Sequence, residues 1–127
     1  ARTIAVTLKC PMVYIDDVKN FDLSIYNLLI IGSPVYAGYP AKEIIDFILD
    51  TNIKKPAKCA IFCTWGAPGW GPTAAKYCLD YMKKNIKSEC IDEFNCPGFH
   101  QLLRTYPSRP NKEDLNKAVE FAKRLIH

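Results

Sequence analysis

Two continuous apolar runs dominate the pattern of hydrophobic and polar positions along the chain. Residues 28–31 read Leu-Leu-Ile-Ile and residues 59–63 read Cys-Ala-Ile-Phe-Cys, with no alternation between apolar and polar side chains. Such runs are typical of strands covered on both faces, as in a parallel sheet packed between helices. The pattern therefore predicts two interior strands at the centre of an α/β domain.

Apolar residues at helical spacing predict three amphipathic helices, all later in the chain than the first of these strands. The first follows Pro40, the second follows Pro72, and the third is capped by Asn111 with Asp114 three residues later. Their predicted inner faces are, in order, Ala41, Ile44, Ile45 and Ile48; Ala75, Cys78, Leu79 and Met82; and Leu115, Ala118, Val119, Ala122, Leu125 and Ile126.

Three shorter segments complete the pattern. Residues 1–8 have apolar positions at helical spacing, although their β-branched content leaves a strand as the alternative. Residues 12–15 predict a short strand, and residues 89–94 alternate as an edge strand with one wet face does. The predicted order is helix, strand, strand, helix, strand, helix, strand, helix.

The composition fits one domain spanning residues 1–127, with 49% hydrophobic and 24% charged residues. The net charge of +4 comes from scattered lysines, so nucleic-acid binding is not indicated. No apolar run approaches the roughly 20 residues of a membrane span, and we expect a cytoplasmic protein without a membrane anchor.

The six cysteines and two histidines do not form a recognisable metal motif. No cysteine pair has C-x-x-C spacing, and the apolar settings of Cys59, Cys63 and Cys78 predict reduced thiols that pack as small hydrophobic side chains. His100 and His127 are predicted to be surface residues. The sequence therefore predicts no metal site.

Two aromatic-bearing segments follow the interior strands. Gly32 is predicted to end the first strand, and Ser33-Pro34 favours an extended loop that carries Tyr36. The segment after the second strand, residues 64–72, contains three glycines, two prolines and both tryptophans. Because ligands bind outside the carboxyl ends of parallel strands, these segments are candidate ligand contacts. An ordinary connection with packed aromatic residues is the alternative.

The segment Gly-Ser-Pro-Val-Tyr-Ala-Gly at residues 32–38, directly after a buried strand, resembles the second flavin-contacting loop of flavodoxin-like FMN proteins. Residues 18–26 and the C-terminal pieces 94–98, 109–115 and 118–121 are also similar to that family. The resemblance implies an α/β fold, a three-layer α/β/α sandwich with a flavodoxin-like parallel sheet in the order 2-1-3-4-5.

The resemblance implies FMN as cofactor, with Tyr36 stacked on one face of the flavin ring and Trp65 or Trp70 on the other. The spacing does not settle which tryptophan serves. Backbone amides near Gly38 and Gly66 would contact the polar edge of the ring, and no protein acid or base is needed. The implied cofactor-binding set is Ser33, Pro34, Val35, Tyr36, Ala37, Gly38, Thr64, Trp65, Gly66 and Trp70.

The function that the resemblance implies is electron transfer or reduction of a small molecule, so an oxidoreductase activity stays open. The partner would be a redox protein or a small electron acceptor, and a homodimer is a further expectation. The alternative is a non-catalytic flavodoxin-like interaction module that has lost FMN binding.

The chain departs from the family pattern at its start. The family begins with a buried strand and an S-x-T-G-N-T-like loop that cradles the FMN phosphate, and this sequence contains neither. That strand belongs in the middle of the sheet, where a gap would leave unpaired backbone groups. We expect that an N-terminal segment is missing here, that residues 3–8 replace it as a strand, or that a partner chain fills the gap.

Overall fold

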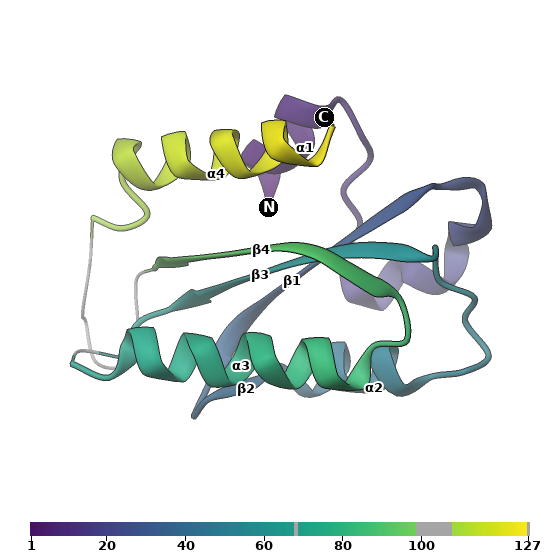
Figure 1. The fold of residues 1–127 in the computed structure, drawn as a ribbon, viewed down its shortest axis with the longest axis horizontal. Coiled ribbons are helices and arrows are strands. Elements are labelled where there is room, and N and C mark those ends of the chain that lie inside the picture. The colour runs from purple at the N-terminus through teal and green to yellow at the C-terminus, as the bar shows by residue number, and fades with distance from the viewer. Residues whose placement is uncertain (68, 99–107, 127) are drawn as a thin grey trace.

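The computed structural model describes residues 1–67, 69–98 and 108–126 (Figure 1). The helices are α1 (Arg2–Leu8), α2 (Lys42–Leu49), α3 (Gly71–Asn85) and α4 (Lys112–Leu125), with short 3-10 helices η1 (Ile15–Asn20) and η2 (Leu23–Ile25). The strands are β1 (Leu28–Tyr36), β2 (Tyr39–Pro40), β3 (Lys58–Trp65) and β4 (Glu89–Pro97).

The sheet has the order β2-β1-β3-β4 and is mixed. Strands β1, β3 and β4 are parallel, with Ile31 opposite Ile61 and Phe62 opposite Phe94. The two-residue strand β2 turns back antiparallel onto the end of β1. The two apolar runs thus form the adjacent parallel strands β1 and β3. The prediction of an interior strand is confirmed for β3, whereas β1 pairs among the described strands on one side only from Leu28 to Pro34.

Helices cover both faces of the sheet, which confirms the three-layer α/β/α fold. Helices α2 and α3 lie on one face, while α1 and α4 lie on the other (Figure 1). Successive residues of β3 point to opposite faces. Ile61 and Cys63 therefore enter the core under α2 and α3, whereas Ala60 and Phe62 pack beneath α4.

The first predicted strand, residues 12–15, is wrong. These residues are irregular up to Tyr14, and the 3-10 helix η1 begins at Ile15. The side chains of Met12 and Tyr14 are 39% and 69% exposed. A short apolar run becomes a strand only where a neighbouring strand pairs with it, and none of the described strands lies beside this run. Residues 3–8 are helical in α1, so the alternative strand there is also wrong.

Two predicted strand ends are also wrong. Gly32 does not end β1, which continues through Ser33 and Pro34 to Tyr36. Extended geometry before a proline is compatible with a strand as well as with a loop. In the same way β4 continues through Asn95 to Pro97, beyond the strand predicted at residues 89–94.

The C-terminal helix α4 begins as predicted. Asn111 and Asp114 form a reciprocal capping box. The inner face needs one correction, because Leu115 and Ile126 are 41% and 62% exposed, while Phe121 is fully buried. The buried positions 114, 118, 121 and 122 lie one or two helical turns apart, and this spacing turns Leu115 away from the sheet.

Candidate functional site

The two aromatic-bearing segments start at the same end of the sheet. The carboxyl ends of the parallel strands are in register there, with Pro34 opposite Thr64 and Trp65 opposite Pro97. Ligands of open α/β sheets bind just outside these carboxyl ends. The fold therefore brings the predicted site residues of the first and second segments to the same end of the molecule.

Ser33 stabilises the start of α2. Its side chain is 3% exposed, and its hydroxyl accepts a hydrogen bond from the Ala41 backbone N–H at 2.8 Å. The same hydroxyl donates to the Pro34 carbonyl at 2.7 Å. The hydroxyl both donates and accepts a hydrogen bond within the fold, so Ser33 has a structural role in joining the end of β1 to the start of α2.

Ala37 and Gly38 form a tight turn between β1 and β2. Their φ angles are 49° and 85°, the left-handed geometry that joins two strands in a two-residue hairpin. The turn lies against α3, because a Cβ placed on Gly38 would be 3.5 Å from the Tyr77 Cβ. Tyr36, immediately before the turn, keeps its side chain 61% exposed.

Trp65 packs into the domain. Its indole N–H donates to the Asn95 side-chain carbonyl at 3.0 Å, and its ring lies over Gly71, where an added Cβ would be 2.1 Å from the ring. Its backbone carbonyl accepts a 2.7 Å hydrogen bond from the Gly98 N–H. Sequence reasoning missed Asn95, because nothing in the chain signals a contact across 30 residues.

Trp70 has a different setting at the N-terminus of α3. Its carbonyl accepts the first helical hydrogen bond, from the Ala74 N–H at 2.9 Å, while its side chain is 50% exposed. The sequence left open which tryptophan could stack on a ligand. The geometry distinguishes them, since the Trp65 ring rests on Gly71 and that of Trp70 faces solvent.

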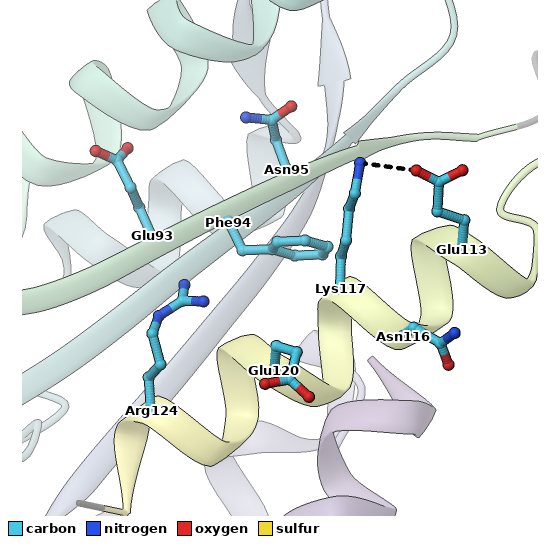
Figure 2. A pocket seen from close by; sticks show the side chains of 8 residues that line it. All are labelled: Glu93, Phe94, Asn95, Glu113, Asn116, Lys117, Glu120 and Arg124. Carbon is cyan, nitrogen blue, oxygen red and sulfur yellow. Dashed lines mark ion pairs between the residues drawn. The ribbon is translucent and has the colours of Figure 1, made fainter.

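A surface groove of about 490 Å³ runs between β4 and α4 (Figure 2). Glu93, Phe94 and Asn95 line it from β4, and charged side chains of α4 line it from the other side. Lys117 pairs there with Glu113 at 3.4 Å. Its side chains carry both signs of charge and are largely solvated, which is typical of an ordinary polar surface.

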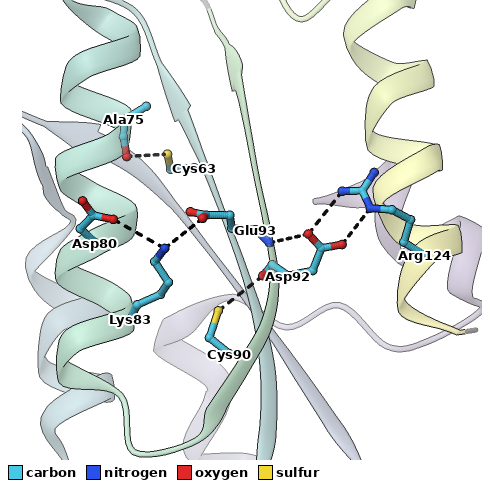
Figure 3. Close-up of polar contacts among 8 residues, drawn as sticks. All are labelled: Cys63, Ala75, Asp80, Lys83, Cys90, Asp92, Glu93 and Arg124. Atoms are coloured by element: carbon cyan, nitrogen blue, oxygen red, sulfur yellow. Dashed lines mark hydrogen bonds and ion pairs between the residues drawn. The ribbon is translucent and has the colours of Figure 1, made fainter.

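Ion pairs tie both helix layers to β4 (Figure 3). Lys83 of α3 contacts Glu93 at 2.9 Å, and Arg124 of α4 contacts Asp92 at 2.9 Å. The hydrogen bond to Glu93 raises the pKa of Lys83. The pKa of Arg124 is raised in the same way by its hydrogen bond to Asp92, and both ion pairs contribute to the attachment of the layers.

The cysteines are free thiols, as predicted, and most are buried. Burial raises the pKa of Cys59 to about 12. A hydrogen bond with Cys78, together with burial, raises the pKa of Cys63, whose thiol also lies 3.8 Å from the Ala75 carbonyl. The raised pKa values keep the Cys59 and Cys63 thiols protonated near neutral pH, where they are poor nucleophiles, whereas the hydrogen bond with Cys63 lowers the pKa of Cys78.

Within residues 1–67, 69–98 and 108–126, no three histidine, cysteine, aspartate or glutamate side chains form a cluster that could hold a metal ion. Nor is any helix in these ranges long and apolar enough to cross a membrane. His100 and His127, for which the sequence predicts surface positions, lie outside the described residues.

The fold, the parallel strand ends and the position of the aromatic segments define a flavodoxin-like α/β protein. Oxidised flavodoxin 1 from Bacillus cereus superposes with a TM-score of 0.65 at 18% identity, covering 99% of this chain and 86% of the flavodoxin. A flavoprotein in complex with FMN from Lactobacillus acidophilus matches more loosely, with a TM-score of 0.44 and 25% identity over 64% of this chain and 58% of that protein.

The sequence comparison identifies a family for the chain. The uncharacterized protein MJ0298 of Methanocaldococcus jannaschii is 33% identical over 132 residues, covering 99% of this chain and 87% of the archaeal protein. The chain therefore belongs to the family of MJ0298. No model of a known family matches the sequence.

Proposed function

We propose that this chain binds FMN at the carboxyl edge of its sheet and serves in electron transfer or in the reduction of a small molecule. The observation that carries the proposal is the pair of exposed aromatic side chains at that edge. Tyr36, the last residue of β1, is 61% exposed, and Trp70, in the segment that follows the adjacent parallel strand β3, is 50% exposed. Large aromatic side chains left in water are costly unless they contact something.

The residues at this edge fit a flat, partly apolar cofactor. Tyr36 and Trp70 offer aromatic faces to a planar ring, and the Ala37-Gly38 turn presents backbone amide groups beside Tyr36. Trp65 fits a supporting role, because its ring already rests on Gly71 and its N–H is bonded to Asn95. Bound FMN would supply the redox chemistry, while the chain holds the ring and shields it from water.

The electron donor or acceptor would be a redox protein or a small molecule that reaches the exposed edge. The net charge of +4 favours a partner with an acidic contact surface, since opposite charges speed association. Screening by salt should then slow electron transfer, which gives a simple check on a candidate partner.

Titration of the purified protein with FMN tests the proposal. We expect flavin fluorescence to change in a saturable way, and Tyr36→Ala and Trp70→Ala each to weaken binding about tenfold, which corresponds to about 1.4 kcal/mol. Tyr77→Ala is the matched control, because Tyr77 is 65% exposed on α3 and alanine keeps the Cβ that lies near Gly38.

Two results would count against the proposal. Protein that takes up no FMN at concentrations of about 100 μM, well above the micromolar range typical of specific binding, would instead favour the non-catalytic interaction module. Binding that neither Tyr36→Ala nor Trp70→Ala weakens more than the control does would place the flavin elsewhere on the surface.

A further inference from the structure

Two cysteines lie directly opposite each other on neighbouring strands. Cys59 of β3 and Cys90 of β4 are partners in the parallel register. Cys59 belongs to the core beneath α2 and α3, and Cys90 packs against the same core, so both side chains lie on one face of the sheet. Neighbouring strands are about 4.8 Å apart, and the Cα atoms of a disulfide are usually about 4.4–6.8 Å apart. The backbone spacing of this pair therefore suits a disulfide.

The thiols of the two residues are in contact. Cys59 and Cys90 share a hydrogen bond, and the Cys90 Sγ also lies 3.5 Å from the Asp92 carbonyl oxygen (Figure 3). The register shifts by one residue directly after this pair, which marks a β-bulge in β4. A bulge disrupts the ladder locally, so β4 is less constrained beside Cys90 than a regular strand is. The sulfurs can therefore approach the roughly 2.0 Å of an S–S bond.

The pair joins one accessible thiol to one buried thiol. Cys90 is partly exposed on the outer strand β4, whereas Cys59 is 0% exposed. Burial raises the pKa of both thiols, and the hydrogen bond between them further raises the pKa of Cys59, to about 12, while it lowers that of Cys90. Cys90 therefore loses its proton before Cys59 does, and it is the thiol that a reagent in solvent meets first.

Cys63 and Cys78 form a second hydrogen-bonded pair, with a different exposure. Both side chains are 0% exposed and lie in the core between β3 and α3. A molecule in solvent does not reach either thiol while the fold is intact. This second pair is therefore an internal control for the reaction of the first.

We propose that Cys59 and Cys90 form a dithiol site that a small-molecule disulfide oxidises, which creates a covalent link between β3 and β4. The Cys90 thiol releases its proton, and its sulfur attacks one sulfur of the reagent, whose other half leaves as a thiolate. Cys59 then releases its proton and attacks the Cys90 sulfur, which expels the second half of the reagent as a thiolate. The protein loses two hydrogens and two electrons, and the two thiolates take up the two protons.

The link holds the outer strand of the sheet. Among the described strands, β4 pairs with β3 alone. Farther along β4, Asn95 accepts the hydrogen bond from the Trp65 indole N–H. A bond between Cys59 and Cys90 closes a loop that contains α3, and it restricts the unfolded chain more than the folded one. Oxidation should therefore increase the resistance of the protein to urea.

Incubation of the folded protein with excess glutathione disulfide at pH 8 tests this site. Cys10→Ser is the background, because the exposed Cys10 reacts with the same reagent. We expect a slow loss of two hydrogens from the intact mass, and peptide mapping that joins Cys59 to Cys90 and leaves Cys63 and Cys78 free. The urea midpoint should rise and should return to its first value on reduction.

Two variants separate the steps of the reaction. Cys59→Ala lacks the second attacking thiol, so glutathione should stay bound to Cys90. Cys90→Ser, a conservative change at a partly exposed position, should abolish the reaction altogether.

Three results would overturn the proposal. The first is an unchanged mass of the folded protein in excess reagent. The second is glutathione that stays on Cys90 while Cys59 is present, since the two sulfurs would then fail to meet. The third is a link that forms only in urea, or one that joins Cys63 to Cys78 instead.

Discussion

Replacing Asp114 tests the capping network of α4. Its carboxylate accepts hydrogen bonds from the Arg109 Nε and Nη2 at 2.5 and 2.6 Å, and from the Asn111 N–H at 2.9 Å. The Asp114 N–H in turn donates to the Asn111 side chain at 3.0 Å. The Asp114 side chain is 2% exposed and that of Arg109 is 30% exposed, so the network is anchored inside the fold.

We expect Asp114→Ala to lower the free energy of unfolding by about 2–4 kcal/mol. Loss of a helix cap accounts for about 1 kcal/mol of this. Removing one partner of a fully buried ion pair costs about 3–5 kcal/mol, and the partial exposure of Arg109 places the cost here below that range. Asp114→Asn keeps the shape and one acceptor, so its loss should be smaller.

The effect should depend on pH in one direction. Hydrogen bonds from Arg109 hold the pKa of Asp114 below its usual value of 3.8, even though burial acts in the opposite sense. The ionised carboxylate therefore stabilises the fold above pH 3.8, and this contribution is lost as pH falls through the lowered pKa. The difference in stability between wild type and Asp114→Asn should shrink below about pH 4.

Urea unfolding followed by circular dichroism, at pH 7 and at several values down to about pH 2.5, measures these differences. Glu113→Gln is the control, because Glu113 is 75% exposed and its pair with Lys117 should contribute less than about 1 kcal/mol. A loss below about 1 kcal/mol for Asp114→Ala, or a difference that does not change with pH, would refute this account of the network.

Two further predictions concern packing and thiol chemistry. Gly71→Ala should lower the free energy of unfolding in urea by about 1–3 kcal/mol, because its Cβ would collide with the Trp65 ring. In the control Gly69→Ala the new Cβ meets no atom within 4 Å, so the loss should be only the roughly 1 kcal/mol of a left-handed residue. Equal losses would contradict the packing of Trp65. At pH 8 a thiol reagent should modify the exposed Cys10 in a fast phase, whereas the buried Cys59, with its pKa of about 12, should react only on unfolding. A Cys10→Ser variant that keeps the fast phase would contradict this expectation.

The parts of the fold that could be predicted are those that local sequence determines. The apolar runs at 28–31 and 59–63 form strands whose side chains are buried or half-buried, and the reciprocal bonds of Asn111 and Asp114 need only residues three positions apart. Strand ends are different, because an extended residue such as Ser33 continues a strand only if a neighbour pairs with it. The predicted strand at 12–15 lacks that neighbour among the described residues.

The candidate site was only partly predictable for the same reason. The sequence places Tyr36 and the tryptophans after two strands that a parallel sheet brings together. It does not distinguish Trp65 from Trp70, since that difference depends on Asn95 and Gly71, which the fold brings to Trp65. The ligand contacts of these residues stay predictions, because the likeness to flavodoxin 1, at 18% identity, establishes the fold alone.

The two outer strands of the parallel sheet, β1 and β4, are protected at their edges in chemically different ways. The edge at β4 has charged side chains that both helix layers hold in ion pairs, with Lys83 on Glu93 and Arg124 on Asp92 (Figure 3). Another strand could add there only by disturbing these pairs, and charge is a usual protection for a strand edge. The described edge of β1 from residue 28 to 34 has no charged side chain and lies in an apolar cavity. Side chains of α1, η1 and α2 line that cavity together with β1, so the β1 edge is protected by the cover of these elements, whereas the β4 edge is protected by charge.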